Sequence, residues 1–172
     1  MSMSHKAYAF DWREFESDEL HHLLIAALES GDPTTITKYI EAHHEQIKDP
    51  FAGQPIEQRW QATFGNRDVH EYGDFALTRF YDPADDQGIA DSWLAVDAAL
   101  APHDRSALLG STLGRPGHEF DPGRQGSYFQ TPERVVESLR RIERITRARE
   151  LESYMQLLSR CAGNGLGVYV TF

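Results

Sequence analysis

The fold of this chain is decided near its C-terminus by residues 127–145, which read SYFQTPERVVESLRRIERI. The short Ser127–Gln130 segment is suited to a strand. Thr131, Pro132 and Glu133 then form a helix start, with an N-cap hydroxyl, a proline at the first helical position and an early acid. The residues that follow predict an amphipathic helix, because apolar side chains recur every three or four positions. These are Val135, Val136, Leu139, Ile142 and Ile145.

The segments after this helix complete the C-terminal part of the fold. The apolar spacing resumes at Leu151 after a charged bridge at Arg147–Glu150, which predicts either two helices or one bent helix. Gly163–Gly167 is typical of a C-cap and turn. Val168–Phe172 is β-branched and aromatic, so we predict that the chain ends in a strand.

The N-terminal segments follow the same logic. Ala7–Phe10 predicts an opening strand, and Ser17 is the expected N-cap of a helix that ends at Gly31. A second helix follows Asp32, and a short third helix surrounds Trp60.

The middle of the chain alternates less regularly. Phe75–Tyr81 predicts a strand, and Asp91 or Ser92 is expected to cap a helix. Ala107–Leu109 predicts a short strand, followed by a Gly- and Pro-rich loop over residues 110–126. Helices interspersed with a few short strands predict an α+β fold. We expect a single compact domain over residues 1–172, with helices packed on a small mixed or antiparallel sheet.

Composition restricts the class of partner. The chain has 172 residues and a formal net charge of -10. Such acidity is unsuited to neutralising phosphate, so we predict binding to neither nucleic acid nor an anionic membrane surface. No apolar run approaches the length of a membrane span. Cys161 is the single cysteine, which is typical of a reducing compartment and predicts a cytoplasmic location.

Charge is distributed unevenly along the chain. Residues 68–104 contain nine Asp or Glu and one Arg, whereas residues 131–172 contain five acids and seven bases. One interpretation is a solvated surface on which the two regions form ion pairs. The other is an acidic docking face for a basic protein partner, because such a face raises association rates and selects partners.

Two short segments combine histidine with carboxylate residues. Brought together, they would hold a divalent metal or supply a general acid and base. The alternative is polar loops with local hydrogen bonds. The sequence contains neither His-Glu-x-x-His nor a phosphate-loop ending, so we assign no metal and predict no cofactor. The candidate polar cluster comprises His70, Glu71, Asp74, His118, Glu119 and Asp121.

The tryptophans allow two interpretations. Trp93 lies at the start of the helix predicted after Ser92. Large aromatic side chains most simply anchor a core. The alternative is an exposed aromatic anchor at an interface with a partner.

The order of motifs over roughly residues 90–172 resembles the YfbM-like family, a bacterial domain of unknown function. Four features carry the resemblance. They are a helix with a tryptophan after an acid, a hydrophobic stretch that enters a Gly-rich turn, a segment with glycine and tyrosine that runs into a Thr-Pro-Glu helix start, and a hydrophobic terminal strand. The resemblance implies a bacterial source and an α+β fold, and it assigns no catalytic residue. The matching segments are Asp91–Asp97, Leu108–Gly110, Gly126–Glu133 and Gly165–Val170.

Three functions stay open at this point. The preferred one is a non-enzymatic binding or interaction module, a class that includes immunity-type inhibitors of basic toxin sites. The alternative is a small-molecule or metal-dependent enzyme that uses the His/Glu/Asp cluster. A third is an oligomerising domain that uses the C-terminal strand as an edge. The sequence leaves the partner, the substrate and the oligomeric state open.

Overall fold

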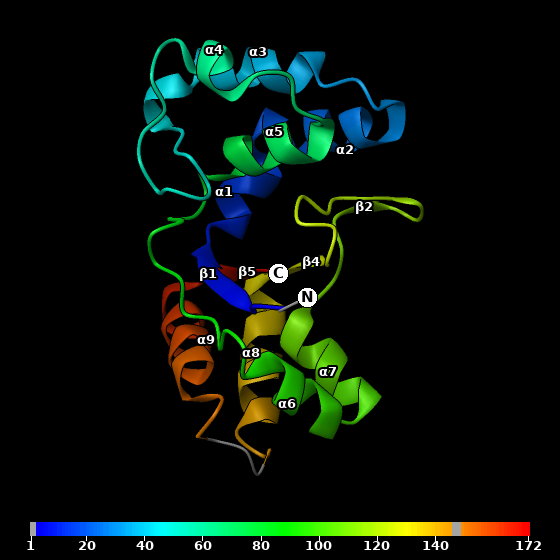
Figure 1. Cartoon of the computed structure of the whole chain (residues 1–172). Coiled ribbons are helices and arrows are strands. Elements are labelled where there is room, and N and C mark those ends of the chain that lie inside the picture. The colour runs from blue at the N-terminus through cyan, green and yellow to red at the C-terminus, as the bar shows by residue number, and fades with distance from the viewer. Residues whose placement is uncertain (1–2, 146–148) are drawn as a thin grey trace.

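A three-stranded sheet separates two layers of helices (Figure 1). The computed structural model describes residues 3–145 and 149–172. In Figure 1 the helices of the N-terminal half lie above the sheet and those of the C-terminal half lie below it, which is the α+β arrangement expected from the sequence. The helical elements are α1 (Trp12–Ser17), α2 (Glu19–Ser30), α3 (Thr34–Ala42), η1 (His44–Gln46), α4 (Trp60–Phe64), α5 (Val69–Leu77), α6 (Trp93–Ala99), α7 (Pro102–Leu109), α8 (Pro132–Ile142) and α9 (Glu152–Asn164).

The main sheet is antiparallel throughout, with strand order β1-β5-β4. The strands predicted near the N-terminus, before the Thr131 helix start and at the C-terminus are all confirmed. The C-terminal strand is central and is bonded along both edges, so the prediction that it offers a free edge for oligomerisation is wrong. The strands are β1 (Lys6–Phe10), β4 (Ser127–Gln130) and β5 (Gly167–Thr171).

Side chains of this sheet alternate between two hydrophobic cores. On the face toward α2, α3 and α5, Tyr8, Tyr169 and Phe129 form one row across the three paired strands. On the opposite face, Val168 and Val170 pack with the C-terminal helices. The sheet is therefore the wall that both cores share, which makes the chain one domain.

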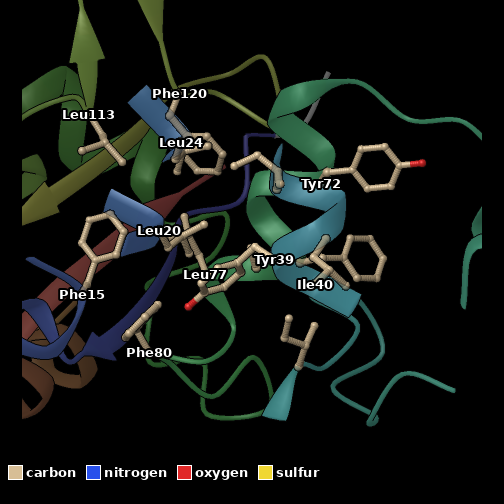
Figure 2. Packing of buried hydrophobic residues seen from close by; sticks show 14 of the residues in the cluster. Phe15, Leu20, Leu24, Tyr39, Ile40, Tyr72, Leu77, Phe80, Leu113 and Phe120 are labelled. Carbon is tan, nitrogen blue, oxygen red and sulfur yellow. The ribbon is translucent and has the colours of Figure 1, made fainter. Parts of the chain in front are cut away.

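The upper core is built where α2, α3 and α5 converge (Figure 2). Leu24 of α2 and Ile40 of α3 are fully buried there. Gly73 lets α5 approach closely, because an added Cβ would lie 2.8 Å from Leu24 and 2.9 Å from the Phe120 ring. Full burial of each large aliphatic side chain contributes roughly 1.5–3 kcal/mol to the free energy of unfolding.

The first long helix begins one residue later than predicted. Asp18, and not Ser17, is the N-cap of α2, and its Oδ1 accepts from the backbone N–H of Leu20 at 2.8 Å. Ser17 instead ends α1, where its hydroxyl donates to the Glu14 carbonyl at 3.0 Å. Gly31 ends α2 with a φ of 71°, as expected.

The strand predicted at Phe75–Tyr81 is wrong, because α5 occupies Val69–Leu77. A capping box starts this helix. Oδ1 of Asp68 accepts from the backbone N–H of Glu71 at 2.9 Å, and a Glu71 carboxylate oxygen accepts from the backbone N–H of Asp68 at 3.3 Å. Most of α5 is buried, so it lacks the polar stripe by which a helix is recognised in sequence.

The strand predicted at Ala107–Leu109 is also wrong, because these residues form the last turn of α7. Pro102 occupies the first turn of that helix. The Gly-rich segment that follows is not entirely a loop. It contains a two-stranded hairpin, β2 (Gly114–Arg115) and β3 (His118–Glu119).

The C-terminal helices agree with the sequence. Thr131 caps α8, and its hydroxyl accepts from the backbone N–H of Arg134 at 3.3 Å. Two separate helices form, since α8 ends at Ile142 and α9 begins at Glu152. The charged bridge predicted between them lies partly outside the described residues. Gly165 ends α9 with a φ of 65°.

Candidate functional site

Helix α5 carries three of the six cluster residues and places them in different surroundings. The ring of His70 stacks on Phe120, with centroids 6.3 Å apart. Glu71 is occupied by the capping box and by an ion pair with Arg67 at 3.0 Å. Asp74 lies one turn after His70 and is buried, with 8% of its surface exposed.

Two residues of the second segment are held by local hydrogen bonds. The His118 ring donates through Nδ1 to the carbonyl of Leu28 at 3.2 Å, which fastens the hairpin to α2. A Glu119 carboxylate oxygen accepts from the backbone N–H of Gly117 at 3.0 Å, which closes the hairpin turn. Both residues therefore match the alternative interpretation of the sequence, a polar loop with local hydrogen bonds.

Within the described residues, the two segments meet at a single hydrogen bond between cluster residues. The backbone N–H of Asp121 donates to Nδ1 of His70 at 3.1 Å, while Oδ1 of Asp121 accepts from the N–H of Gly126 at 3.0 Å. Over residues 3–145 and 149–172, no three His, Cys, Asp or Glu side chains are grouped so as to hold a metal ion. The geometry thus gives no support to a metal centre built from the predicted cluster.

Asp74 is the cluster residue that lines a pocket. The pocket has a volume of about 60 Å³, room for about two water molecules at ~30 Å³ each. Its buried lining includes Asp74, Tyr8 and Tyr81, and its rim includes Lys6 and Phe51. The Phe51 side chain is unusual among large apolar residues because 75% of it is exposed.

The register of the sheet builds this pocket. Lys6 and Tyr8 are two residues apart on β1, so both point to the face that α5 covers. On the neighbouring strand β5, Thr171 lies opposite Lys6 and Tyr169 lies opposite Tyr8. A polar row therefore borders the mouth of the pocket, and a tyrosine row lies deeper.

The Asp74 carboxyl is held by tyrosine hydroxyls. Its Oδ1 accepts from Tyr81 at 3.2 Å and from Tyr169 at 3.4 Å. Burial raises the pKa of Asp74 to about 7, although these two hydrogen bonds and the nearby charge of Lys6 lower it. Burial and the neighbouring carboxyl raise the pKa of both tyrosines, so they stay protonated and remain donors. Near neutral pH the carboxyl therefore exists in both protonation states.

Two loops close the pocket from the sides. A carboxylate oxygen of Asp49 accepts from the backbone N–H groups of Phe51 at 2.7 Å and Ala52 at 3.1 Å, which fixes the turn that presents Phe51. Gly123 lies against the C-terminal residue, because an added Cβ would be 2.4 Å from the carbonyl oxygen of Phe172. Any larger residue at position 123 would push this wall outward.

Among the described residues, the charges that act on Asp74 and Tyr8 come from more carboxylates than cations. The charge of Asp49 raises the pKa of Asp74, and the charge of Asp86 raises the pKa of Tyr8 after the larger effect of burial. Lys6 is the cation whose charge acts on Asp74 in the opposite direction. The field in the pocket therefore favours a positive group.

The other acids of residues 68–104 are distributed over both sides of the sheet. Six of the nine form ion pairs with basic residues of the described chain. Two of these pairs, Asp85–Arg160 and Asp104–Arg141, join residues 68–104 to residues 131–172, so the predicted pairing between the two regions is confirmed only in part. Asp74 differs because its partners are neutral hydroxyls. The pairs are Asp68–Arg124, Glu71–Arg67, Asp82–Lys48, Asp85–Arg160, Asp97–Arg105 and Asp104–Arg141.

Trp93 lies in the lower core and is 1% exposed, so it anchors the core and is not available to a partner. Its ring stacks on His5, with centroids 5.1 Å apart. Burial lowers the pKa of His5 to about 4, and its Nδ1 accepts from the backbone N–H of Ile89 at 3.2 Å.

Comparison of the chain with protein-family models, with curated proteins and with solved structures finds no match. The resemblance to the YfbM-like family therefore stays a prediction. None of the helices in the described part of the chain is both long and apolar enough to cross a membrane.

Sequence reasoning found Asp74 but missed its neighbours. The sequence does not single out Lys6, Tyr8, Tyr81 or Tyr169, although each terminal strand shows a tyrosine flanked on both sides by alanine or valine. The pairing of β1 with β5 is what brings these residues to one pocket, and a single sequence does not show that pairing.

Proposed function

We propose that this chain is a binding module that receives a lysine ammonium group, presented by a basic protein partner, in the Asp74 pocket. The observation that carries the proposal is a buried carboxyl in an aromatic-lined pocket that opens to solvent beside Lys6 and Phe51. In this proposal the acidic surface that receives the basic partner is the Asp74 pocket, in place of the extended docking face expected from the sequence. The cytoplasmic location predicted from the single cysteine belongs to the same proposal.

The lining suits an ammonium group. Tyr8, Tyr81 and Phe51 present aromatic rings, which attract cations through their faces. The volume of about 60 Å³ admits a head group and not a whole metabolite. The exposed Phe51 ring at the rim is placed to contact the aliphatic part of the incoming lysine or the surface around it.

Charge supports the same class of partner. The net charge of -10 attracts basic proteins at long range. Asp49 and Asp86 add negative potential at the pocket, and Lys6 opposes it. An incoming ammonium would compete with Lys6 for the ionised Asp74, so removing Lys6 is expected to strengthen binding.

The proposal is tested by an NMR titration with Nα-acetyl-lysine methylamide at pH 8 and low salt. The uncharged norleucine analogue serves as the control ligand. We expect the lysine compound to shift the resonances of Tyr8, Tyr81 and Phe51. Asp74→Asn is expected to weaken binding at least about tenfold, because a charge-assisted contact is lost.

Two further variants sharpen this test. Lys6→Gln is expected to tighten binding. Glu57→Gln, which removes an exposed charge that is not part of the pocket lining, is expected to leave the affinity unchanged. Equal affinity of the wild type and Asp74→Asn, or equal binding of the norleucine analogue, would contradict the proposal.

A second candidate function rests on the same carboxyl. A buried carboxyl with a pKa of about 7 is suited to general acid–base catalysis at neutral pH. In this alternative Asp74 moves a proton on a small substrate that reaches the pocket. It is tested by incubating the wild type and Asp74→Asn with a metabolite mixture and following turnover by mass spectrometry. The alternative requires turnover that the variant lacks, and its absence removes the alternative.

A further inference from the structure

Residues of α7, of α8 and of the turn after α8 line a larger groove. Both helices lie on the side of the sheet opposite α5, the helix that carries Asp74 (Figure 1). The groove volume of about 570 Å³ is typical of small-molecule sites, which span roughly 300–1,000 Å³. Helix α8 and the turn after it supply Arg134, Arg140, Arg141 and Arg144, and α7 supplies His103. The groove therefore concentrates positive charge in a chain that is acidic as a whole.

Two of these arginines are fixed by neutral acceptors. Arg134 donates from Nη1 to the hydroxyl of Ser111 at 3.1 Å and from Nη2 to the carbonyl of Ser106 at 3.3 Å. Arg141 donates to the carbonyl of His103 at 3.3 Å. Contacts of this kind orient a guanidinium group without neutralising it, which prepares it for a charged ligand.

The charges of the groove are incompletely balanced. Arg140 and Arg144 form no ion pair with any residue in the described part of the chain. Glu137 is the carboxylate in the groove lining, and Asp104 approaches Arg141 at 3.8 Å. Four guanidinium groups thus face two carboxylates, so the groove keeps a net positive charge.

We infer that this groove binds a small compound with several phosphate charges, such as a pyrophosphate or a bisphosphate ester. Arginine forks bind phosphate oxygens in pairs, and more than one fork is available here. The described residues of the lining include no Phe, Tyr or Trp on which a nucleobase would stack. The acidic remainder of the chain opposes the long phosphate backbone of a nucleic acid. This site is separate from the Asp74 pocket and does not depend on its function.

The test is a calorimetric titration with pyrophosphate at low ionic strength, with succinate as the comparison anion. We expect pyrophosphate to bind more tightly than succinate. Arg140→Gln combined with Arg144→Gln is expected to weaken binding at least about tenfold, because two charged donors are lost. Glu137→Gln is expected to tighten it several-fold, because it removes a competing carboxylate.

The matched control combines Lys38→Gln with Arg59→Gln, which removes the same charge from exposed positions in the upper half. It is expected to keep the wild-type affinity. The inference is overturned if pyrophosphate does not bind, if succinate binds equally well, or if both double variants weaken binding to the same extent. Weaker binding by Glu137→Gln would also overturn it.

Discussion

The hydroxyl of Tyr169 lies 3.4 Å from Oδ1 of Asp74, although the two residues are 95 positions apart. The contact joins the central strand β5 to α5 across the upper core. Tyr81 adds a second hydroxyl to the same oxygen at 3.2 Å. A carboxyl in this position costs free energy when it ionises, because burial removes its water. The pKa of Asp74 therefore depends on the groups that surround it in the pocket, and measuring this pKa detects changes there.

Asp74→Asn is expected to raise the free energy of unfolding at pH 8 by roughly 1–3 kcal/mol. The pKa of Asp74 is about 7 in the folded chain against an ordinary value of 3.8, so the folded chain binds more protons between these values. The contribution of Asp74 to stability should therefore fall as pH rises from about 4 to 7, and this contribution is the difference between the pH profiles of the wild type and Asp74→Asn. Urea denaturation at pH 5 and pH 8 measures the effect, with Glu57→Gln as the control. An identical pH dependence in wild type and Asp74→Asn would show that Asp74 does not ionise as described.

Tyr169→Phe is expected to raise the pKa of Asp74 further. The hydroxyl of Tyr169 stabilises the ionised carboxyl, and the Phe variant removes that donor while keeping the ring. A ¹³C NMR titration of the Asp74 carboxyl measures the change. Tyr128→Phe is the control, because Tyr128 packs in the lower core. A lower pKa in Tyr169→Phe would contradict the hydrogen bond.

His5 is expected to make the lower core sensitive to acid. Its pKa is about 4 in the folded chain against 6.5 ordinarily, so only the unfolded chain binds this proton between those values. Stability should be lost as pH falls from about 6.5 to 4, by roughly 3 kcal/mol in full. Because Asp74 acts in the opposite direction over much of this range, the comparison is between Asp74→Asn and the double variant with His5→Asn. Equal slopes in these two proteins would refute the effect.

The start of α2 offers a direct comparison of the two N-cap assignments. Asp18→Ala is expected to lower the free energy of unfolding by about 2 kcal/mol, because Asp18 caps the helix and also binds Arg79 at 3.0 Å and Tyr39 at 2.8 Å. Ser17→Ala is expected to change it by less than about 0.5 kcal/mol. Thermal denaturation of both variants measures this difference. A larger loss of unfolding free energy in Ser17→Ala than in Asp18→Ala would support Ser17 as the N-cap, as predicted from the sequence.

The C-terminal half was predictable because its signals are local and agree with one another. Thr131 and Pro132 mark the start of α8, its apolar stripe has helical spacing, and Gly165 ends α9. By contrast, α5 was misread because nearly all its residues are buried. Its capping box at Asp68 and Glu71 was the signal that would have identified it.

The candidate site was predictable only in part. Asp74 was singled out with five other polar residues, but sequence spacing did not distinguish it from Glu71 or Glu119, which are engaged in local bonds. What separates Asp74 is its burial against Tyr81 and Tyr169, and this depends on the pairing of strands that lie at opposite ends of the chain.

The most direct measurement is the pKa of Asp74 by ¹³C NMR with and without saturating Nα-acetyl-lysine methylamide. A cation bound beside the carboxyl favours its ionised form. The account predicts that the pKa falls from about 7 when the lysine compound binds, and that the norleucine analogue leaves it unchanged. A pKa that stays the same or rises in the presence of the lysine compound would contradict a cation-binding pocket.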